Sequence, residues 1–294
     1  MAHSLTIVIP AKNEAKGLAM ILPELKTLYP DAEIIVVNDA STDDTPTLAH
    51  ALGVKVISHP YSKGNGAAIK SGLRVASGEL VICMDADGQH LPKDIGLLLK
   101  RIDDGFDMVV GARNSAGQAS LQRGLANRFY NRFASWMVGH TIEDLTSGFR
   151  IMRTSKAREF LSLLPNKFSY PTTITMSFFR AGYSVAYVPI DVQPRLPGTQ
   201  SHIRLWQDGV RFLLIIFKIG TLFSPLKLFF PISLCFFITA VMYYLYTFIE
   251  SNRFTNMSAL LFTTSVLIFL MGLISEQITS LIYKDTPSDN QNKS

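Results

Sequence analysis

The sequence predicts an α/β fold with a mixed, largely parallel sheet, followed by interfacial helices and a two-helix transmembrane hairpin. Short apolar runs alternate with amphipathic segments through the first half of the chain, which is typical of a sheet covered by helices. The second observation concerns charge: only five of the 71 residues from 213 to 283 are charged. The whole chain is 48% hydrophobic and 17% charged, whereas soluble domains are about 25% charged. This composition excludes a purely soluble protein, a disordered chain and a disulfide-rich scaffold.

Five strands are predicted in the first part of the chain. Each is a short run that is apolar on both faces, as burial under helices requires: Leu5–Ile9, Glu33–Val37, Lys55–Ser58, Leu80–Met84 and Met108–Val110. Apolar residues at helical spacing predict helices between them, at Glu14–Leu28, Gly64–Ala76 and Pro92–Ile102. Ser41 and Asp44 are spaced like an N-cap and its partner, which predicts a further helix after the second strand.

Beyond Gly111 the alternation weakens, and the pattern indicates an added half of the same domain. Two more strands are expected near Phe149–Met152 and Val185–Val188, and three helices near Gln118–Val138, Ala157–Leu163 and Thr172–Ala181. We therefore expect one α/β domain over residues 1–202. The polar residues 284–294 are expected to form a disordered tail.

Two long apolar runs predict a membrane hairpin over residues 229–283. Phe229–Ile249 has no charge in 21 residues, and Met257–Ser275 has none in 19. Each matches the roughly 20 residues that cross a bilayer as a helix. We expect spans at 229–249 and 257–282, with Glu276 facing protein or the interface because a charge is costly in lipid.

The segment 203–228 is expected to form amphipathic juxtamembrane helices, because charged and apolar residues recur there at helical spacing. Ser224-Pro225 and Pro231 are expected to break it into short pieces. The loop between the two spans has a single basic residue, Arg253, whereas several basic residues flank the hairpin at its other end. Both termini are therefore expected in the cytoplasm. The first ten residues lack the features of a secretory signal. No basic run stands out, which argues against nucleic-acid binding.

Polar clusters follow four of the predicted strands. They are Pro10–Glu14, Asn38–Thr45, Asp85–His90 and Gly111–Arg113. In open α/β sheets ligands bind beyond the carboxyl ends of the strands, so all four clusters are expected on one edge. One cluster alone is ordinary loop polarity, but four together indicate an active-site rim.

The cluster after the fourth strand indicates a metal site. Alternate residues of an extended segment point the same way, so Asp85, Asp87 and Gln89 are expected to offer three oxygens to one Mg²⁺ or Mn²⁺ ion. Such ions are usually held by one or two carboxylates plus substrate phosphates. The alternative is a solvated Asp-Gly turn. Asp39 is expected either to hydrogen-bond a nucleotide or to form a turn, and Lys63–Gly66 either to approach a phosphate or only to enter a helix.

Taken together, these motifs resemble the family-two inverting glycosyltransferases of the GT-A fold. Within them the chain is most similar to the polyprenyl-phosphate glycosyltransferases, a group that includes dolichol-phosphate mannose synthase. The matching segments span most of residues 5–200: Ile7–Glu14, Val37–Asp43, Asp85–His90, Gly111–Arg113 and Thr146–Arg150. The tail hairpin also resembles that of membrane-anchored members.

The resemblance implies inverting transfer of a sugar from a UDP- or GDP-sugar to a polyprenyl monophosphate, undecaprenyl or dolichyl, with Mg²⁺ or Mn²⁺ on Asp85, Asp87 and Gln89. It implies nucleotide contacts from Pro10, Ala11, Glu14, Val37, Asp39 and Ala86. The acceptor phosphate would meet Arg113, Arg128, Arg195 and His202, and Asp144 would line the sugar site. The expected catalytic set is thus Asp85, Asp87, Arg113, Arg128, Asp144 and Arg195. The bilayer is an expected partner, as is a homo-oligomer, since relatives form tetramers; the bacterial inner membrane is the expected location.

Two departures from the family pattern affect ligand binding. Lys12 stands where the family often has Tyr, which leaves the stacking on the base and the identity of the nucleotide open. His202 stands where relatives carry Lys, in a segment that is one residue longer, and its contact to phosphate weakens above the ordinary His pKa of about 6.5.

Three other functions are compatible with parts of the pattern. A polysaccharide or glycolipid synthase would extend a sugar hydroxyl, but the Gln-x-x-Arg-Trp motif of such synthases is absent from the sequence. A nucleotidyltransferase acting on a lipid phosphate would differ in its product. An inactive homologue serving as a membrane scaffold would not need the intact Asp85, Asp87 and Gln89 set.

Overall fold

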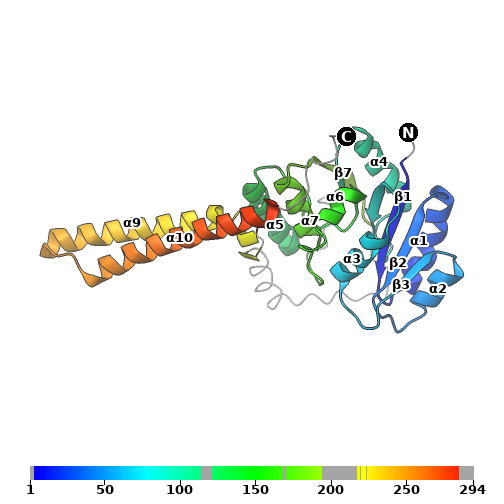
Figure 1. Cartoon of the computed structure of the whole chain (residues 1–294), viewed down its shortest axis with the longest axis horizontal. Coiled ribbons are helices and arrows are strands. Elements are labelled where there is room, and N and C mark those ends of the chain that lie inside the picture. Colours follow the sequence, from blue (N-terminus) through cyan, green and yellow to red (C-terminus); the bar gives the residue numbers. More distant parts are fainter. Residues whose placement is uncertain are drawn as a thin grey trace. The chain divides into compact units, whose positions relative to one another are not determined.

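The computed structural model describes residues 3–113, 121–167, 170–193, 217–218, 220–222 and 224–284. The chain divides into two compact units, Met1–Ile203 and Arg204–Ser294. The first is an α/β unit, and the second contains a long helical hairpin (Figure 1).

A seven-stranded mixed sheet forms the centre of the first unit, in the order β3-β2-β1-β4-β6-β5-β7. Its strands are β1 (Leu5–Ala11), β2 (Glu33–Asn38), β3 (Lys55–Ser58), β4 (Leu80–Cys83), β5 (Met108–Arg113), β6 (Arg150–Arg153) and β7 (Val185–Ile190). Only β6 runs antiparallel to its neighbours, with Cys83 opposite Arg150 on one side and Val110 opposite Arg150 on the other. All seven predicted strands are therefore confirmed, and the sheet is mixed and mostly parallel as expected.

Helices cover both faces of this sheet. On one face α1 (Ala15–Leu28), α2 (Thr45–Ala51) and α4 (Ile95–Asp103) bury apolar side chains against Ile7, Ile9 and their neighbours in one core. The other face carries α3 (Asn65–Val75), whose Gly72 lies so close to β1 that a Cβ there would be 2.3 Å from a methyl group of Val8. Alternate strand residues thus point into two separate layers, as a doubly covered sheet requires.

The unit has four further helical elements in its described residues. They are a short 3₁₀ helix η1 (Pro92–Asp94), α5 (Leu121–Val138), α6 (Thr154–Glu159) and α7 (Tyr170–Arg180). The predicted helix Pro92–Ile102 is thereby divided in two, and the predicted helix near Ala157–Leu163 in fact begins at Thr154. The start of the helix expected from Gln118 lies outside the described residues, which resume at 121.

The hairpin consists of α9 (Pro225–Ser251) and α10 (Asn256–Lys284), so the sequence located both apolar helices. Their 27- and 26-residue apolar segments contain 18-residue windows with mean hydropathies of 2.0 and 2.2, so both helices are long and apolar enough to cross a membrane. The predicted break at Pro231 is wrong, because α9 is continuous through it. The predicted break at Ser224-Pro225 is confirmed, because Ser224 lies outside the helix and α9 begins at Pro225. Pro225 occupies the first helical turn, where its missing N–H costs nothing.

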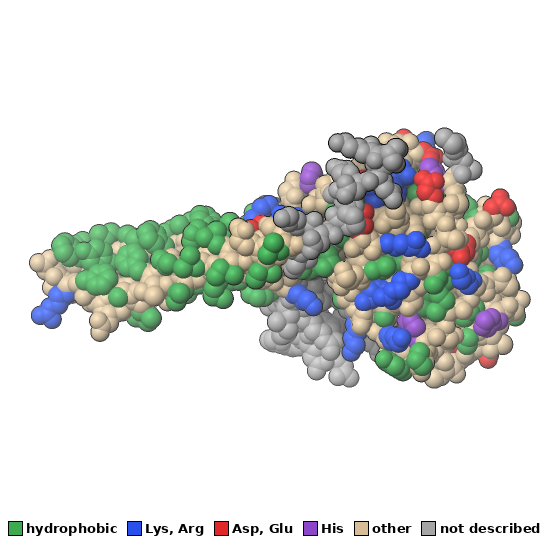
Figure 2. Space-filling view, in the orientation of Figure 1, with side chains coloured by type: hydrophobic (Ala, Val, Ile, Leu, Met, Phe, Trp, Pro, Cys, Tyr) green, Lys and Arg blue, Asp and Glu red, His purple; other side chains and the backbone are tan. Residues whose placement is uncertain are grey.

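Small residues every seven positions form the seam between α9 and α10. They are Ser233, Ala240 and Thr247 on one helix and Ser258, Ser265, Gly272 and Thr279 on the other. Ser233 and Ser265 each donate a 2.9 Å hydrogen bond to the other's backbone carbonyl. Glu276 accepts the backbone N–H of Leu226 at 3.3 Å, so its carboxylate faces the partner helix and the first turn of α9. Large apolar side chains remain on the outer faces (Figure 2).

Candidate active site

The loops after β1 and β2 are joined by hydrogen bonds at the carboxyl edge of the sheet. Three backbone N–H groups at the start of α1, those of Asn13, Glu14 and Ala15, donate to Ser41 Oγ (3.0 Å), Thr45 Oγ1 (2.9 Å) and Asp43 Oδ2 (3.3 Å). The loop after β2 therefore satisfies the free N–H groups that every helix start leaves. The predicted N-cap at Ser41 is wrong: α2 begins at Thr45, and Ser41 serves α1 instead.

Asp39 is buried behind this rim, and its carboxylate organises the loop after β3. One oxygen accepts His59 Nδ1 (2.7 Å) and the Lys63 N–H (2.8 Å). The other oxygen accepts Ser62 Oγ (2.7 Å) and the Gly64 N–H (2.9 Å). Burial alone raises the pKa of Asp39, but these donors together lower it to about 2. Asp39 is thus an anionic anchor for residues 59–64, a role for which sequence spacing gave no signal.

The glycines that enter α3 allow close packing against residues 165–167. A Cβ on Gly66 would lie 2.0 Å from the carbonyl oxygen of Pro165. Two backbone N–H groups in the first turn of the helix donate to backbone carbonyls of residues 166 and 167. The Gly66 N–H donates to the Lys167 carbonyl at 3.2 Å, and the Ala67 N–H donates to the Asn166 carbonyl at 2.8 Å. Of the two roles considered for Lys63–Gly66, the structure shows the entry to a helix.

The predicted metal-binding residues lie at the end of β4, but not in an extended segment. Residues 86–87 form a turn and Gly88 has φ +73°, so the argument from strand alternation is wrong there. Asp87 Oδ1 accepts the Gln89 N–H at 3.1 Å, and a Cβ on Gly148 would lie 2.7 Å from Asp85 Oδ2. Over the described ranges no three His, Cys, Asp or Glu side chains come together as a metal site. Two carboxylates and an amide still suit a hard cation that also takes phosphate oxygens.

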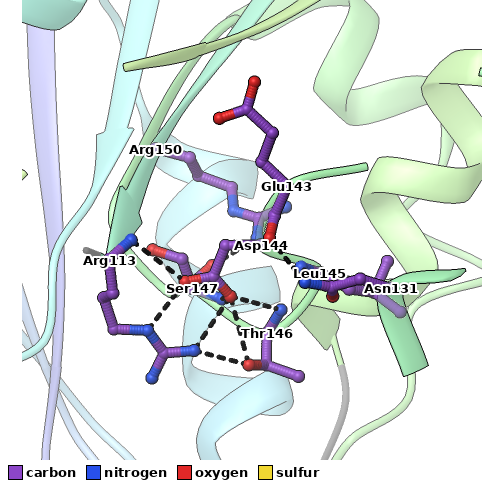
Figure 3. Close-up of polar contacts among 8 residues, drawn as sticks. All are labelled: Arg113, Asn131, Glu143, Asp144, Leu145, Thr146, Ser147 and Arg150. Atoms are coloured by element: carbon purple, nitrogen blue, oxygen red, sulfur yellow. Dashed lines mark hydrogen bonds and ion pairs between the residues drawn. The ribbon is translucent and has the colours of Figure 1, made fainter. Parts of the chain in front are cut away.

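Arg113 and Asp144 form the best-defined ion pair of the site (Figure 3). Arg113 Nε donates to Asp144 Oδ2 at 2.7 Å, and Nη2 donates to Oδ1 at 2.9 Å and to Thr146 Oγ1 at 2.6 Å. The backbone N–H groups of Thr146 and Ser147 both reach Oδ1 at 3.1 Å. Burial raises the pKa of Asp144, yet Arg113 and the backbone donors hold it below its ordinary value. Asp144 is therefore a fixed anion that orients a guanidinium.

Two residues that the sequence reading missed support this pair. Asn131 of α5 accepts the Leu145 N–H at 3.1 Å and donates to the Glu143 carbonyl, which ties the helix to the Asp144 loop (Figure 3). Arg150 is fully buried and donates to the carbonyls of Pro171 (3.0 Å) and Ser147 and to Thr175 Oγ1 (2.8 Å). Arg150 lies opposite Cys83 of β4 in the sheet. Its buried guanidinium therefore adds positive potential near Asp85.

His90 completes the described rim. It is buried, stacks on Phe149 with 4.9 Å between ring centres, and its Nδ1 has no hydrogen-bond partner in the described part of the chain. Burial lowers its pKa to about 4, so the ring is neutral at physiological pH. Asp87, Arg113 and Asp144 all act on it electrostatically, which places the two halves of the predicted site close together.

The other predicted residues differ in how much they expose. Among the nucleotide set, Pro10 and Glu14 are partly exposed, whereas the side chains of Ala11, Val37 and Ala86 are buried and could offer only backbone atoms. Arg128 is exposed on α5. Arg195 and His202 lie outside the described residues, as does most of the predicted amphipathic segment 203–228.

Two family models match the chain. The model described as "Glycosyl transferase family 2" matches residues 6–161, and the "GtrB C-terminal hairpin" matches residues 224–281. Together they cover the α/β unit up to α6 and nearly all of the hairpin.

Several named proteins are similar to this chain. The putative glycosyltransferase CsbB of Bacillus subtilis is 29% identical, with 95% of this chain and 88% of that protein covered. The polyprenol monophosphomannose synthase of Mycolicibacterium smegmatis is 31% identical over 64% of this chain and 77% of its own. The dolichyl-phosphate hexose transferase of Haloferax volcanii is 26% identical, with 67% of this chain and 86% of that protein covered.

A solved structure supports the fold assignment. Glucosyl-3-phosphoglycerate synthase from Mycobacterium tuberculosis, in complex with Mn²⁺ and UDP-glucose, superposes with a TM-score of 0.59. The two are 20% identical over 74% of this chain and 78% of that one. At this identity the likeness concerns the GT-A-type fold.

Proposed function

We propose, from the premise that the chain belongs to glycosyl transferase family 2 and to its polyprenyl-phosphate glycosyltransferase group, that it moves a sugar from a UDP- or GDP-sugar to a polyprenyl monophosphate. One observation carries the proposal: a family 2 domain and a GtrB-type hairpin occur in one chain. A lipid-linked acceptor explains why an enzyme with a water-soluble donor carries apolar helices. Relatives named for polyprenol and dolichyl phosphate transfer support the same acceptor class.

On the donor side, Pro10, Glu14 and the loop held by Asp39 are proposed to surround the nucleotide, with backbone atoms of Ala11, Val37 and Ala86 beside them. Asp85, Asp87 and Gln89 are proposed to hold Mg²⁺ or Mn²⁺. When bound, the ion would neutralise the nucleoside diphosphate as it leaves. The buried Arg150 lies opposite Cys83 in the sheet, so it brings positive charge to the end of β4 that leads to these carboxylates.

On the acceptor side, the chemistry needs positive charge rather than a base. A phosphate monoester has a second pKa of about 6 and is mostly a dianion at pH 7. Its oxygen can attack the anomeric carbon directly, which inverts the configuration. Two anions must then be held together, and Arg113, Arg128 and Arg195 are proposed to screen them, with His202 nearby.

The Arg113–Asp144 pair favours a phosphate acceptor over a hydroxyl acceptor. A sugar hydroxyl would need a carboxylate base to take its proton. Both oxygens of Asp144 are already occupied by donors, and its pKa is lowered, so it is a poor base. Arg113 uses Nε and Nη2 for this pair, and among the described residues Nη1 makes no hydrogen bond, which suits it to a phosphate oxygen.

We further propose that both termini are cytoplasmic, that the enzyme works at the cytoplasmic face of a bacterial inner membrane, and that hairpins of several copies can associate. Hydropathy and the flanking basic residues support the topology. A cysteine-accessibility map of the loop around Arg253 and of the C-terminus in intact cells tests it: the loop should react with an impermeant thiol reagent, and the C-terminus should not.

The decisive test is a transfer assay with membranes that hold the full chain. Radiolabelled UDP- and GDP-sugars are added separately, with polyprenyl phosphate and Mg²⁺ or Mn²⁺, and with EDTA as a control. We expect an organic-extractable, EDTA-sensitive product from one donor, abolished in Asp87→Asn and kept in Asp104→Asn, whose carboxylate lies on the surface beside Arg101. A labelled product only with hydroxyl acceptors, or an active Asp87→Asn enzyme, would refute the proposal.

A further inference from the structure

The outward face of α5 carries three aromatic side chains in contact, which we call the aromatic ladder: Phe129, Phe133 and Trp136. Ring centres are 6.5 Å apart between Phe129 and Phe133 and 5.8 Å apart between Phe133 and Trp136. Phe129 is 60% exposed and Trp136 is 48% exposed. This face is the more exposed side of α5, since the residues that α5 buries in its described part are Tyr130, Ala134 and Met137.

Two exposed arginines run beside the aromatic ladder. Arg128 and Arg132 are one turn apart, and Arg132 is one turn before Trp136. At about 100° per residue these positions and the ladder share an arc of roughly 140° on the helix. One surface of α5 therefore combines rings with guanidinium groups, and the opposite surface is buried.

This combination matches the interfacial region of a bilayer better than water. Trp and other aromatic rings concentrate at the headgroup level. Arg side chains reach lipid phosphates while their methylene stems stay in apolar surroundings. The chain also carries two helices long and apolar enough to span a membrane, so a bilayer is continuously available to the α/β unit that precedes them.

We propose that the outward face of α5 docks on the headgroup region of the bilayer, with the aromatic ladder below the lipid phosphates and Arg132 on them, while Arg128 stays assigned to the acceptor phosphate. This goes beyond the proposed transfer reaction, because it concerns how the α/β unit is held and not what it transfers. Asn131 links the same helix to Glu143 and Leu145, so docking fixes the height of the Asp144 loop above the membrane.

Tryptophan fluorescence can test the docking directly. The chain has two Trp residues, Trp136 and Trp206, so the variant Trp206→Phe leaves Trp136 as the single reporter. The full-length variant is reconstituted into phosphatidylcholine–phosphatidylglycerol vesicles that carry a nitroxide at the headgroup, at a shallow chain position or at the chain end. We expect the shallow and headgroup nitroxides to remove most of the Trp136 emission, the deep nitroxide to remove less, and iodide to have little effect.

A matched reporter on another helix supplies the control. Leu97 of α4 is 48% exposed, like Trp136, so Leu97→Trp in a background of Trp136→Phe and Trp206→Phe should be quenched by iodide and not by lipid nitroxides. In the Trp136 reporter, Phe129→Ser should weaken the nitroxide quenching. Arg132→Glu should weaken it more on vesicles with phosphatidylglycerol than on phosphatidylcholine alone.

Two outcomes would overturn the proposal. Trp136 protected from iodide but not quenched by any nitroxide would mean that another protein surface, such as a second copy, covers the ladder. Trp136 open to iodide and unaffected by nitroxides would mean that this face lies in water. Transfer activity is measured on the same samples, so that failure of docking and failure of the proposed reaction appear separately.

Discussion

Replacing Asp39 with Asn tests whether one buried carboxylate holds the loop beyond β3. The amide keeps the shape of the carboxylate, and its oxygen can still accept from His59 and Lys63. Its NH₂ group then faces Ser62 and the Gly64 N–H. The Ser62 hydroxyl can rotate to accept, but the Gly64 N–H cannot, so one buried donor faces another donor.

The magnitude follows from the pKa. The pKa of Asp39 is lowered from 3.8 to about 2, and each pKa unit is worth about 1.4 kcal/mol, which gives about 2 kcal/mol of stability from its ionised form. A group with a lowered pKa stabilises the fold above its unfolded pKa, and that stability is lost as the pH falls through the folded value. The contribution should therefore be complete above pH 4 and fade toward pH 2.

The assay is thermal unfolding of the full chain in detergent, followed by circular dichroism. A loss of about 2 kcal/mol corresponds to a fall in Tm of roughly 4–8 °C for a unit of this size. Glu33→Gln is the matched control, because Ser77, Lys55 and Thr6 lower the pKa of Glu33 to about 2 after burial has raised it. Glu33→Gln should lower Tm at least as much as Asp39→Asn does. Only Asp39→Asn should speed amide hydrogen exchange at Lys63 and Gly64.

The reasoning is refuted if Asp39→Asn leaves Tm unchanged at pH 7. It is equally refuted if the difference in Tm between wild type and variant stays constant between pH 4 and pH 2, because the carboxylate charge would then contribute nothing.

Three further predictions concern the ion pair, the sheet and the hairpin. Asp144→Asn should lower kcat by about 100-fold, because the Arg113 guanidinium loses its fixed partner; initial rates at saturating donor check this against Asp104→Asn. Gly72→Ala should destabilise the α/β unit by about 1–3 kcal/mol, because the new methyl group meets Val8, as urea titration would show. Ser233→Ala and Ser265→Ala should show a coupling energy of about 0.6 kcal/mol in a double-mutant cycle of hairpin unfolding in micelles.

Each of these has an outcome that contradicts it. Unchanged rates in Asp144→Asn would mean that the pair does not serve transfer. An equally stable Gly72→Ala protein would mean that α3 moves away from β1 at no cost. Strictly additive serine variants would mean that the reciprocal hydrogen bonds are replaced by others.

The elements could be predicted because each depends on local pattern. Apolar runs gave all seven strands, and the two uncharged stretches gave α9 and α10. The predicted helix cap failed because Ser41 Oγ accepts the Asn13 N–H at the start of another helix, 28 residues away in sequence. The hydrophobic pattern does not contain that choice, since an oxygen near two helix starts can serve either.

The site could be predicted as a rim but not as a set of contacts. The positions of Asp39, Asp85 and Arg113 could be predicted because each lies at or just after the end of a strand on one edge of the sheet. His59, Asn131 and Arg150 were missed because each acts across 12 to 25 residues of sequence, through side-chain bonds that only the packed fold brings together. The alternation argument for Asp87 failed because the strand ends at Cys83, four residues before it.

The strand order also has a consequence for synthesis on the ribosome. β4 and β5 are neighbours in sequence, but β6 lies between them in the sheet. Until residue 153 has emerged, both strands present open edges that could pair with a foreign strand. The half that bears Asp39 and Asp85 and the half that bears Arg113 are joined in the sheet by the four residues of β6 alone. Substitutions that weaken β6 should therefore reduce the yield of folded nascent chains before they affect any ligand.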